Sequence, residues 1–141
     1  MPIHLHGSAA GLARFALCGV TLAAVSALAQ AEWTKLSTTA QGHALHVQTP
    51  VRPHTGSVIQ VITLLDYGQT QYWGHKGERF QSSTASWELN CGNGEYRSMN
   101  FSAYAQGMGR GAVITQQSQS TDWGPAPTGS IPSELLRWAC R

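Results

Sequence analysis

Apolar and polar residues alternate along this chain with the period of two that is typical of strands. Residues 44–49 place Leu45 and Val47 on one side and His46 on the other, which predicts a half-buried strand with the histidine on the solvent-exposed face. Residues 57–67 are apolar on both sides. We therefore expect a central strand there, covered on both faces of its sheet.

Two further pairs of strands are indicated by turn residues between alternating runs. Residues 84–91 and 95–105 flank Gly92-Asn93-Gly94, and an Asn-Gly between two such runs favours a hairpin. The glycine-rich residues 107–111 form a second predicted turn, which leads into a strand at 112–117. No lysine or helix follows these glycines, so a phosphate-binding loop is not expected.

A helix is predicted near the C-terminal end, after a segment that should form neither strand nor helix. Residues 124–129 read Gly-Pro-Ala-Pro-Thr-Gly and predict a connector. Ser130 then has the chemistry of an N-cap, and Pro132 falls in the first turn, where its missing donor is tolerated. Apolar residues follow at helical spacing, namely Leu135, Leu136 and Ala139.

The first 31 residues have the pattern of a secretory signal peptide. Arg14 precedes an apolar run at 15–28, and small residues follow at Ala29 and Ala31, either of which fits a cleavage point. The competing interpretation is a membrane anchor, but the run is shorter than the roughly 20 strongly apolar residues that a span requires. We expect one domain over 32–141, exported to the periplasm or the outer-membrane surface.

The cysteine count changes once the signal peptide is removed. Cys18 lies in the apolar run, so the mature chain keeps Cys91 and Cys140, and an even pair in an oxidising compartment predicts a disulfide. The alternative is that Cys18 is a lipid acceptor, because Gly19 follows it; Leu17 stands where a small residue is expected.

The low and scattered charge of the chain argues against a nucleic-acid partner. The chain has a net charge of +2 with only 11% charged residues, and its nine Lys and Arg are scattered rather than grouped in a stripe. A nucleic-acid partner is therefore not expected. No span is expected in the mature chain, and its oligomeric state stays open.

Several short motifs, taken in order, resemble those of the surface-adhesin protein E family. They begin at Trp33 and continue through L-x-D-Y at 64–67, E-x-x-C at 88–91, Arg97 and Tyr104, and a closing W-x-x-x-P…G-S…E-L-L-x-W-x-C at 123–140. The resemblance covers nearly all of the mature chain, although none of the motifs is catalytic.

The resemblance implies both a fold and a function. The fold is mostly β: a bent antiparallel sheet of about six strands, with a C-terminal helix docked on its concave face by one disulfide. The function is binding of host extracellular-matrix or plasma proteins such as vitronectin, laminin and plasminogen. The alternative is a periplasmic envelope-maintenance or enzyme-inhibitor protein, and neither hypothesis requires a cofactor or enzymatic activity.

Arginine and tryptophan supply the candidate partner-binding residues, since both are enriched in binding hot spots. We predict such roles for Arg79, Arg97, Arg110 and Trp73. Trp33 is a second candidate for an exposed anchor, although core packing is the commoner role for either tryptophan. The other tryptophans, Trp87, Trp123 and Trp138, are expected to fill the core between sheet and helix.

Histidines at 43, 46, 54 and 75 raise a metal or haem hypothesis. His43 and His46 would point to opposite faces of a strand, and the mature chain offers no free thiol, so we expect surface histidines and no metal. Asp66, Glu78 and Glu88 show no spacing that would bring two of them together for acid-base chemistry.

Overall fold

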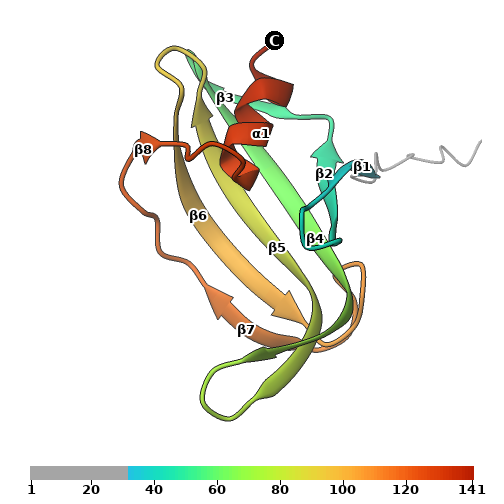
Figure 1. Ribbon diagram of the computed structural model, residues 1–141. Coiled ribbons are helices and arrows are strands. Elements are labelled where there is room, and N and C mark those ends of the chain that lie inside the picture. Colours follow the sequence, from blue (N-terminus) through green and yellow to red (C-terminus); the bar gives the residue numbers. More distant parts are fainter. Residues whose placement is uncertain (1–31) are drawn as a thin grey trace, which may run out of the picture.

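The computed structural model describes residues 32–141, which form an eight-stranded antiparallel sheet and one helix (Figure 1). The elements are β1 (Glu32–Thr38), β2 (Ala44–Thr49), β3 (Arg52–Thr55), β4 (Val58–Trp73), β5 (Glu78–Asn90), β6 (Glu95–Tyr104), β7 (Val113–Gln117), β8 (Gly124–Pro125) and α1 (Ile131–Ala139). The signal peptide expected at 1–31, with Cys18, lies outside the described residues.

The strand order confirms the predicted fold class and extends it. The main path through the sheet is β1-β2-β4-β5-β6-β7, which accounts for six strands. The two additional strands are short: β3 shares an edge of β4 with β2, and β8 shares an edge of β6 with β7. Two or four residues are too few to show a period in the sequence, which is why neither strand was predicted.

The hairpin of β4 and β5 is longer than the sequence indicated. β4 continues to Trp73 and β5 begins at Glu78, although residues 68–71 are Gly-Gln-Thr-Gln, a polar run. The register between the strands shifts between Asp66 and Gln71, and Gly68 has a φ of +66°. We call residues 71–80 the hairpin arm, which Figure 1 shows extending beyond the rest of the sheet.

One face of the sheet, the helix face, carries the apolar core. Val47, Val61 and Leu89 are fully buried there, and Leu135 of α1 packs on them. Trp87 and Trp138 surround this cluster, as predicted. Figure 1 shows α1 lying across β4 and β5 near one end of the sheet, so a nine-residue helix covers only part of this face.

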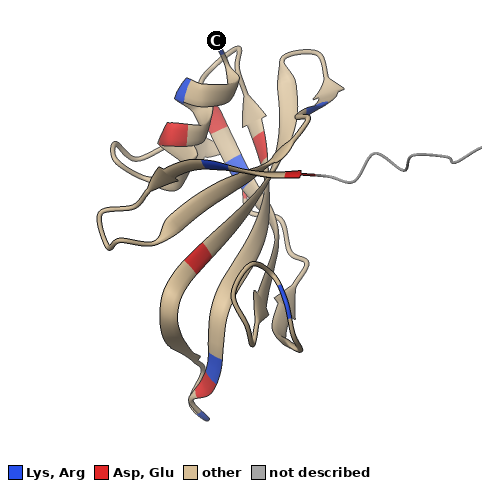
Figure 2. Ribbon diagram, turned by 90° about the vertical axis from the view of Figure 1, so that its right-hand side faces the viewer, with Lys and Arg blue, Asp and Glu red and all other residues tan. Residues whose placement is uncertain are grey.

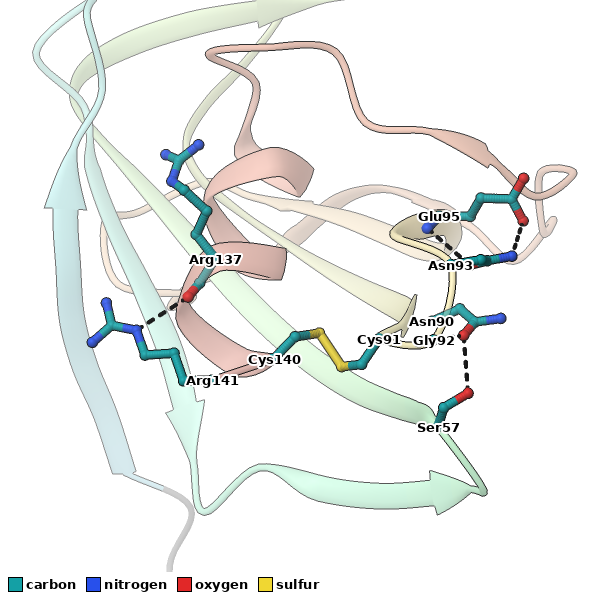
Figure 3. The surroundings of a disulfide bond; sticks show 9 residues. All are labelled: Ser57, Asn90, Cys91, Gly92, Asn93, Glu95, Arg137, Cys140 and Arg141. Carbon is teal, nitrogen blue, oxygen red and sulfur yellow. Dashed lines mark hydrogen bonds between the residues drawn. A yellow bond between two sulfur atoms is a disulfide. The ribbon is translucent and has the colours of Figure 1, made fainter.

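Both ends of α1 are fixed. At its start the Ser130 hydroxyl accepts a hydrogen bond from the Ser133 amide at 3.3 Å, which confirms the predicted N-cap. At its end Cys140 is bonded to Cys91, with the two Cα atoms 5.4 Å apart (Figure 3). Cys91 follows β5 directly and begins the turn in which Gly94 has a φ of +74°. The disulfide therefore joins the helix to the end of the β5–β6 hairpin.

The opposite face, the loop face, is closed by residues 105–111. Ser82 is fully buried there and accepts a hydrogen bond from the Gly109 amide at 2.8 Å while donating one to the Gln106 carbonyl at 2.5 Å. Leu64 is fully buried under the same loop, and a methyl group at Gly109 would lie 3.2 Å from Leu64 Cδ1. β4 is thus covered on both faces, as its sequence predicted.

Two expectations are corrected, and one strand was not predicted. Trp123 is absent from the core under α1; its ring lies 4.8 Å from the Arg97 guanidinium, which extends to Glu88 on the loop face. The segment 124–129 does contribute β8, because Gly124 and Pro125 pair with Tyr96 and Glu95 of β6. β1 was missed because it is an edge strand with little apolar alternation, EWTKLST.

Candidate functional site

An apolar slot lies on the helix face beside the first residue of α1. It encloses about 180 Å³ and brings together residues from β2, β4, β5, β6 and α1. Its lining residues are Leu45, Thr63, Leu65, Tyr67, Ser83, Ala85, Trp87, Ser98, Phe101 and Ile131. An apolar cavity of about 150 Å³ holds a benzene ring, so the slot has room for one aromatic or branched aliphatic side chain.

The slot stays open because α1 is too short to fill it. Leu135 packs into the core one turn further along the helix, whereas Ile131, the first residue of α1, is the helix residue that lines the slot. The apolar side chains that line the slot are therefore buried or half-buried around an open space, with Leu45 fully buried and Leu65, Ala85 and Phe101 half-buried.

Most polar groups in the slot already have partners. The Trp87 indole nitrogen donates to the Thr63 hydroxyl at 2.9 Å, and the hydroxyls of Tyr67 and Ser83 lie 2.9 Å apart. Buried polar groups that are satisfied in this way do not demand a polar ligand. The slot is suited to an apolar group.

A second, more polar cavity of about 480 Å³ adjoins the slot. The two share Leu65 and Ile131 as lining residues, so they lie side by side on the helix face. The polar part is bounded by the turn between β1 and β2 and by the start of α1, with Thr38, Thr39, Ala40, Gln41, His43, Gly129, Ser130 and Glu134 as its other lining residues. We call the slot and this cavity together the helix-face groove.

Aromatic contacts brace the groove. Tyr67 lies edge-on to His43, with ring centroids 4.9 Å apart, and edge-on to Phe80 at 5.3 Å. Such arrangements stabilise aromatic pairs beyond their buried area. The groove is therefore bounded by side chains whose positions are fixed before any ligand arrives.

Arg97, one of the predicted partner-binding residues, is engaged within the protein. Its guanidinium contacts the carboxylate of Glu88 through two nitrogens, at 2.6 and 2.5 Å, while Trp123 lies beneath it. The Glu88 side chain is only 4% exposed, and His54 Nε2 approaches its other oxygen at 3.3 Å. A buried carboxylate requires such a partner, so this arginine has a structural role.

Of the other three predicted residues, Trp73 and Arg79 lie on the hairpin arm, where their side chains emerge on opposite sides, and Arg110 lies in the 105–111 loop. Arg79 is exposed on β5. It precedes Glu88 by nine residues, so about 30 Å of extended strand separates the two Cα atoms. Trp73 is half-buried and stacks on Phe101 with ring centroids 5.6 Å apart. Arg110 is exposed in the loop that covers Leu64, where its Nε donates to the Gly107 carbonyl.

The four histidines occupy different elements. His46 is half-buried on β2, His54 contacts Glu88 from β3, and His75 is exposed in the tip of the hairpin arm, while His43 packs on Tyr67. Within residues 32–141 no three His, Cys, Asp or Glu side chains come close enough to hold a metal ion.

The comparison with protein families decides where this chain belongs. The model of the surface-adhesin protein E family matches residues 33–141. This chain is a member of the surface-adhesin protein E family. Membership supports a surface adhesin with protein partners and a location outside the cytoplasm. In the part of the chain that the structure describes, no helix has the length and hydropathy to cross a membrane.

Solved structures agree on the fold. A structure of Haemophilus influenzae protein E has a TM-score of 0.58 at 10% identity, covering 77% of this chain and 83% of that one. Its crystal form II gives 0.58 at 10% identity with 76% and 95% coverage, and protein E from non-typeable H. influenzae gives 0.55 at 11% with 77% and 84%. No curated protein matches the sequence significantly. At 10–11% identity, the similarity to these structures establishes the fold of this chain and not its binding partners.

The sequence analysis missed the helix-face groove. One signal was present: the apolar face of residues 57–67 and 84–103 is longer than a helix of about ten residues can cover. The mismatch in length predicts an uncovered apolar strip, but its place depends on where the disulfide holds α1.

Proposed function

We propose that this protein is an exported bacterial surface adhesin that binds host extracellular-matrix or plasma proteins, and that it acts by binding rather than by catalysis. The observation that carries the proposal is the family match over residues 33–141. Both mature cysteines are bonded to each other, so neither supplies a thiol nucleophile.

The helix-face groove is the proposed contact surface. Protein interfaces concentrate their binding energy in a few apolar anchors that enter pockets surrounded by polar groups. The slot offers the pocket, and the adjoining cavity with His43, Gln41 and Glu134 offers the polar surroundings. A partner would insert one apolar side chain between Ala85 and Ile131.

The residues predicted from the sequence have unequal places in this proposal. Trp73 stacks on Phe101, a lining residue of the slot, so it extends the same apolar surface. Arg79 and Arg110 are exposed and remain proposed contacts outside the groove. Arg97 already neutralises Glu88, so it is the weakest of the four.

Filling the slot tests the proposal. Ala85→Leu adds apolar bulk to the slot, and Ala112→Leu adds the same bulk at an exposed position away from it. We expect wild type and Ala112→Leu to bind immobilised vitronectin, laminin or plasminogen saturably, and Ala85→Leu to bind at least tenfold more weakly at unchanged melting temperature. Equal binding by both variants would remove the groove from the proposal.

Location distinguishes the alternative. Protease treatment of intact cells should cleave a displayed adhesin and leave a periplasmic protein whole. Protection of the chain, together with no binding to matrix or plasma proteins, would contradict the adhesin function and favour an envelope-maintenance or inhibitor role.

A further inference from the structure

The outer side of the hairpin arm holds an exposed aromatic ring beside an arginine. Tyr72 is 70% exposed, the highest value among the large hydrophobic residues of the described chain. It pairs directly with Arg79 across the two strands, so their Cβ atoms lie about 5 Å apart on the same side of the arm. Neither residue belongs to the helix-face groove.

Arg79 differs from Arg97 in having no ion-pair or aromatic partner in the part of the chain that the structure describes. Within residues 32–141 no carboxylate lies within 4.0 Å of the Arg79 guanidinium, and no aromatic ring lies beneath it. Arg97, by contrast, is fixed by Glu88 and Trp123. The five donors of Arg79 are therefore available for a planar anion such as a carboxylate.

A polar cavity lies next to Arg79. It has a volume of about 320 Å³ and is lined by Thr70, Arg79, Gln81 and Ala105. Gln81 follows Arg79 by two residues on β5, which places both side chains on one side of the strand. The cavity thus offers a hydroxyl and an amide, which both donate and accept hydrogen bonds, beside a cation.

The arm is held rigid from its other side. Trp73 stacks on Phe101, and Phe80 is 6% exposed with its ring against Tyr67. Three cross-strand pairs fix the backbone from Gln71–Phe80 to Trp73–Glu78. The backbone that carries Tyr72 and Arg79 is consequently fixed in advance, which reduces the entropy that a ligand must overcome.

We propose that Tyr72, Arg79, Thr70 and Gln81 form a binding site for a saccharide that carries a carboxylate. The tyrosine ring offers a flat apolar surface for the C–H face of a sugar ring. Arg79 pairs with the carboxylate, and the threonine and glutamine hydrogen-bond to sugar hydroxyls.

The chemistry favours a single carboxylate over a polyanion. A polysulfated chain or a nucleic acid needs a row of cations, whereas Figure 2 shows the charged residues few and scattered over the described chain. Arg79 is the one charged residue among those that line the cavity, and its neighbours there, Thr70 and Gln81, are neutral, which matches one acidic sugar.

The test uses 3′-sialyllactose and a hyaluronan tetrasaccharide as probes, with lactose as the uncharged control. The protein is expressed from its complete sequence, purified with its disulfide formed, and titrated by calorimetry and saturation-transfer NMR. We expect saturable binding of at least one acidic probe and about tenfold weaker binding of lactose.

Matched variants locate the site. Arg79→Gln and Tyr72→Ser should each weaken the acidic probe about tenfold, while Arg137→Gln, which removes an exposed arginine from α1, should leave it unchanged. Equal losses in Arg79→Gln and Arg137→Gln, equal binding of lactose, or no saturable binding would each overturn the proposal.

This site is independent of the helix-face groove. Ala85→Leu should leave saccharide binding unchanged, and Arg79→Gln should leave the groove open. Failure of either proposal can therefore be recognised without reference to the other.

Discussion

The two faces of the sheet are closed in different ways. On the helix face, Val47, Val61 and Leu89 are covered by Leu135 of a helix that a covalent bond holds in place. On the loop face, polar residues Ser82, Ser86 and Glu88 are buried. Ser82 hydrogen-bonds to the covering loop, whereas Glu88 is paired with Arg97 of the neighbouring strand. The same sheet thus buries apolar side chains on its helix face and several polar side chains on its loop face.

The difference follows from what each cover supplies. A helix of nine residues is marginal on its own, so it requires apolar area and a tether. A loop brings backbone amides and carbonyls with it, and these must be satisfied when they are buried. Ser82, with one donor and one acceptor contact, meets that need, whereas the helix face needs only apolar contact.

Removing the tether should have the largest effect. Replacing both cysteines with alanine, or reducing the protein, opens a loop of 49 residues, and the chain-entropy model assigns about 4 kcal/mol to its closure. We expect this loss in the free energy of unfolding by urea titration, together with early loss of helical circular dichroism. Hydrogen exchange at the Gly109 amide should change less than exchange within α1.

The opposite result would contradict the view that the disulfide holds the cover of the helix face. If reduction left the helical signal and the unfolding midpoint unchanged, packing of Leu135 alone would suffice to hold α1.

Breaking the ion pair of the loop face should rank second. Arg97→Met leaves the Glu88 carboxylate buried with only His54 nearby. Removing one partner of a fully buried pair costs 3–5 kcal/mol, and since the Arg97 side chain is 31% exposed we expect about 2 kcal/mol. Arg79→Met, at an exposed arginine on the same sheet, should cost under about 0.5 kcal/mol. Equal unfolding midpoints for the two variants would show that Glu88 does not depend on Arg97.

The smallest effect should come from Ser82→Ala. The change removes two hydrogen bonds to residues 105–111, and we expect a loss of about 1 kcal/mol and faster hydrogen exchange at Gly109. Ser118→Ala, at an exposed position after β7, serves as the control. Unchanged exchange at Gly109 would mean that the loop is held by Leu64 rather than by Ser82.

Most of the fold was predictable because its signals are local. The alternation around Leu45 and Val47, the apolar run of β4, the Asn-Gly turn and the Ser130 cap each act within a few residues. The pairing of Cys91 with Cys140 followed from counting cysteines in an exported chain. The contact between Trp123 and Arg97 was not predictable, because it joins segments 26 residues apart in the sequence.

The sequence alone determined strands β2 and β4 to β7, although not the full length of the β4–β5 hairpin. It also determined the capped helix, the disulfide and the family, since each depends on residue type and spacing. The tertiary structure decided which apolar residues stay uncovered and which arginine stays free. Those outcomes depend on where the disulfide places a short helix on a long sheet and on which side of a bent hairpin a side chain emerges. Both the position of the helix on the sheet and the side from which an arm residue emerges arise from contacts between distant segments, so no single stretch of the chain determines them.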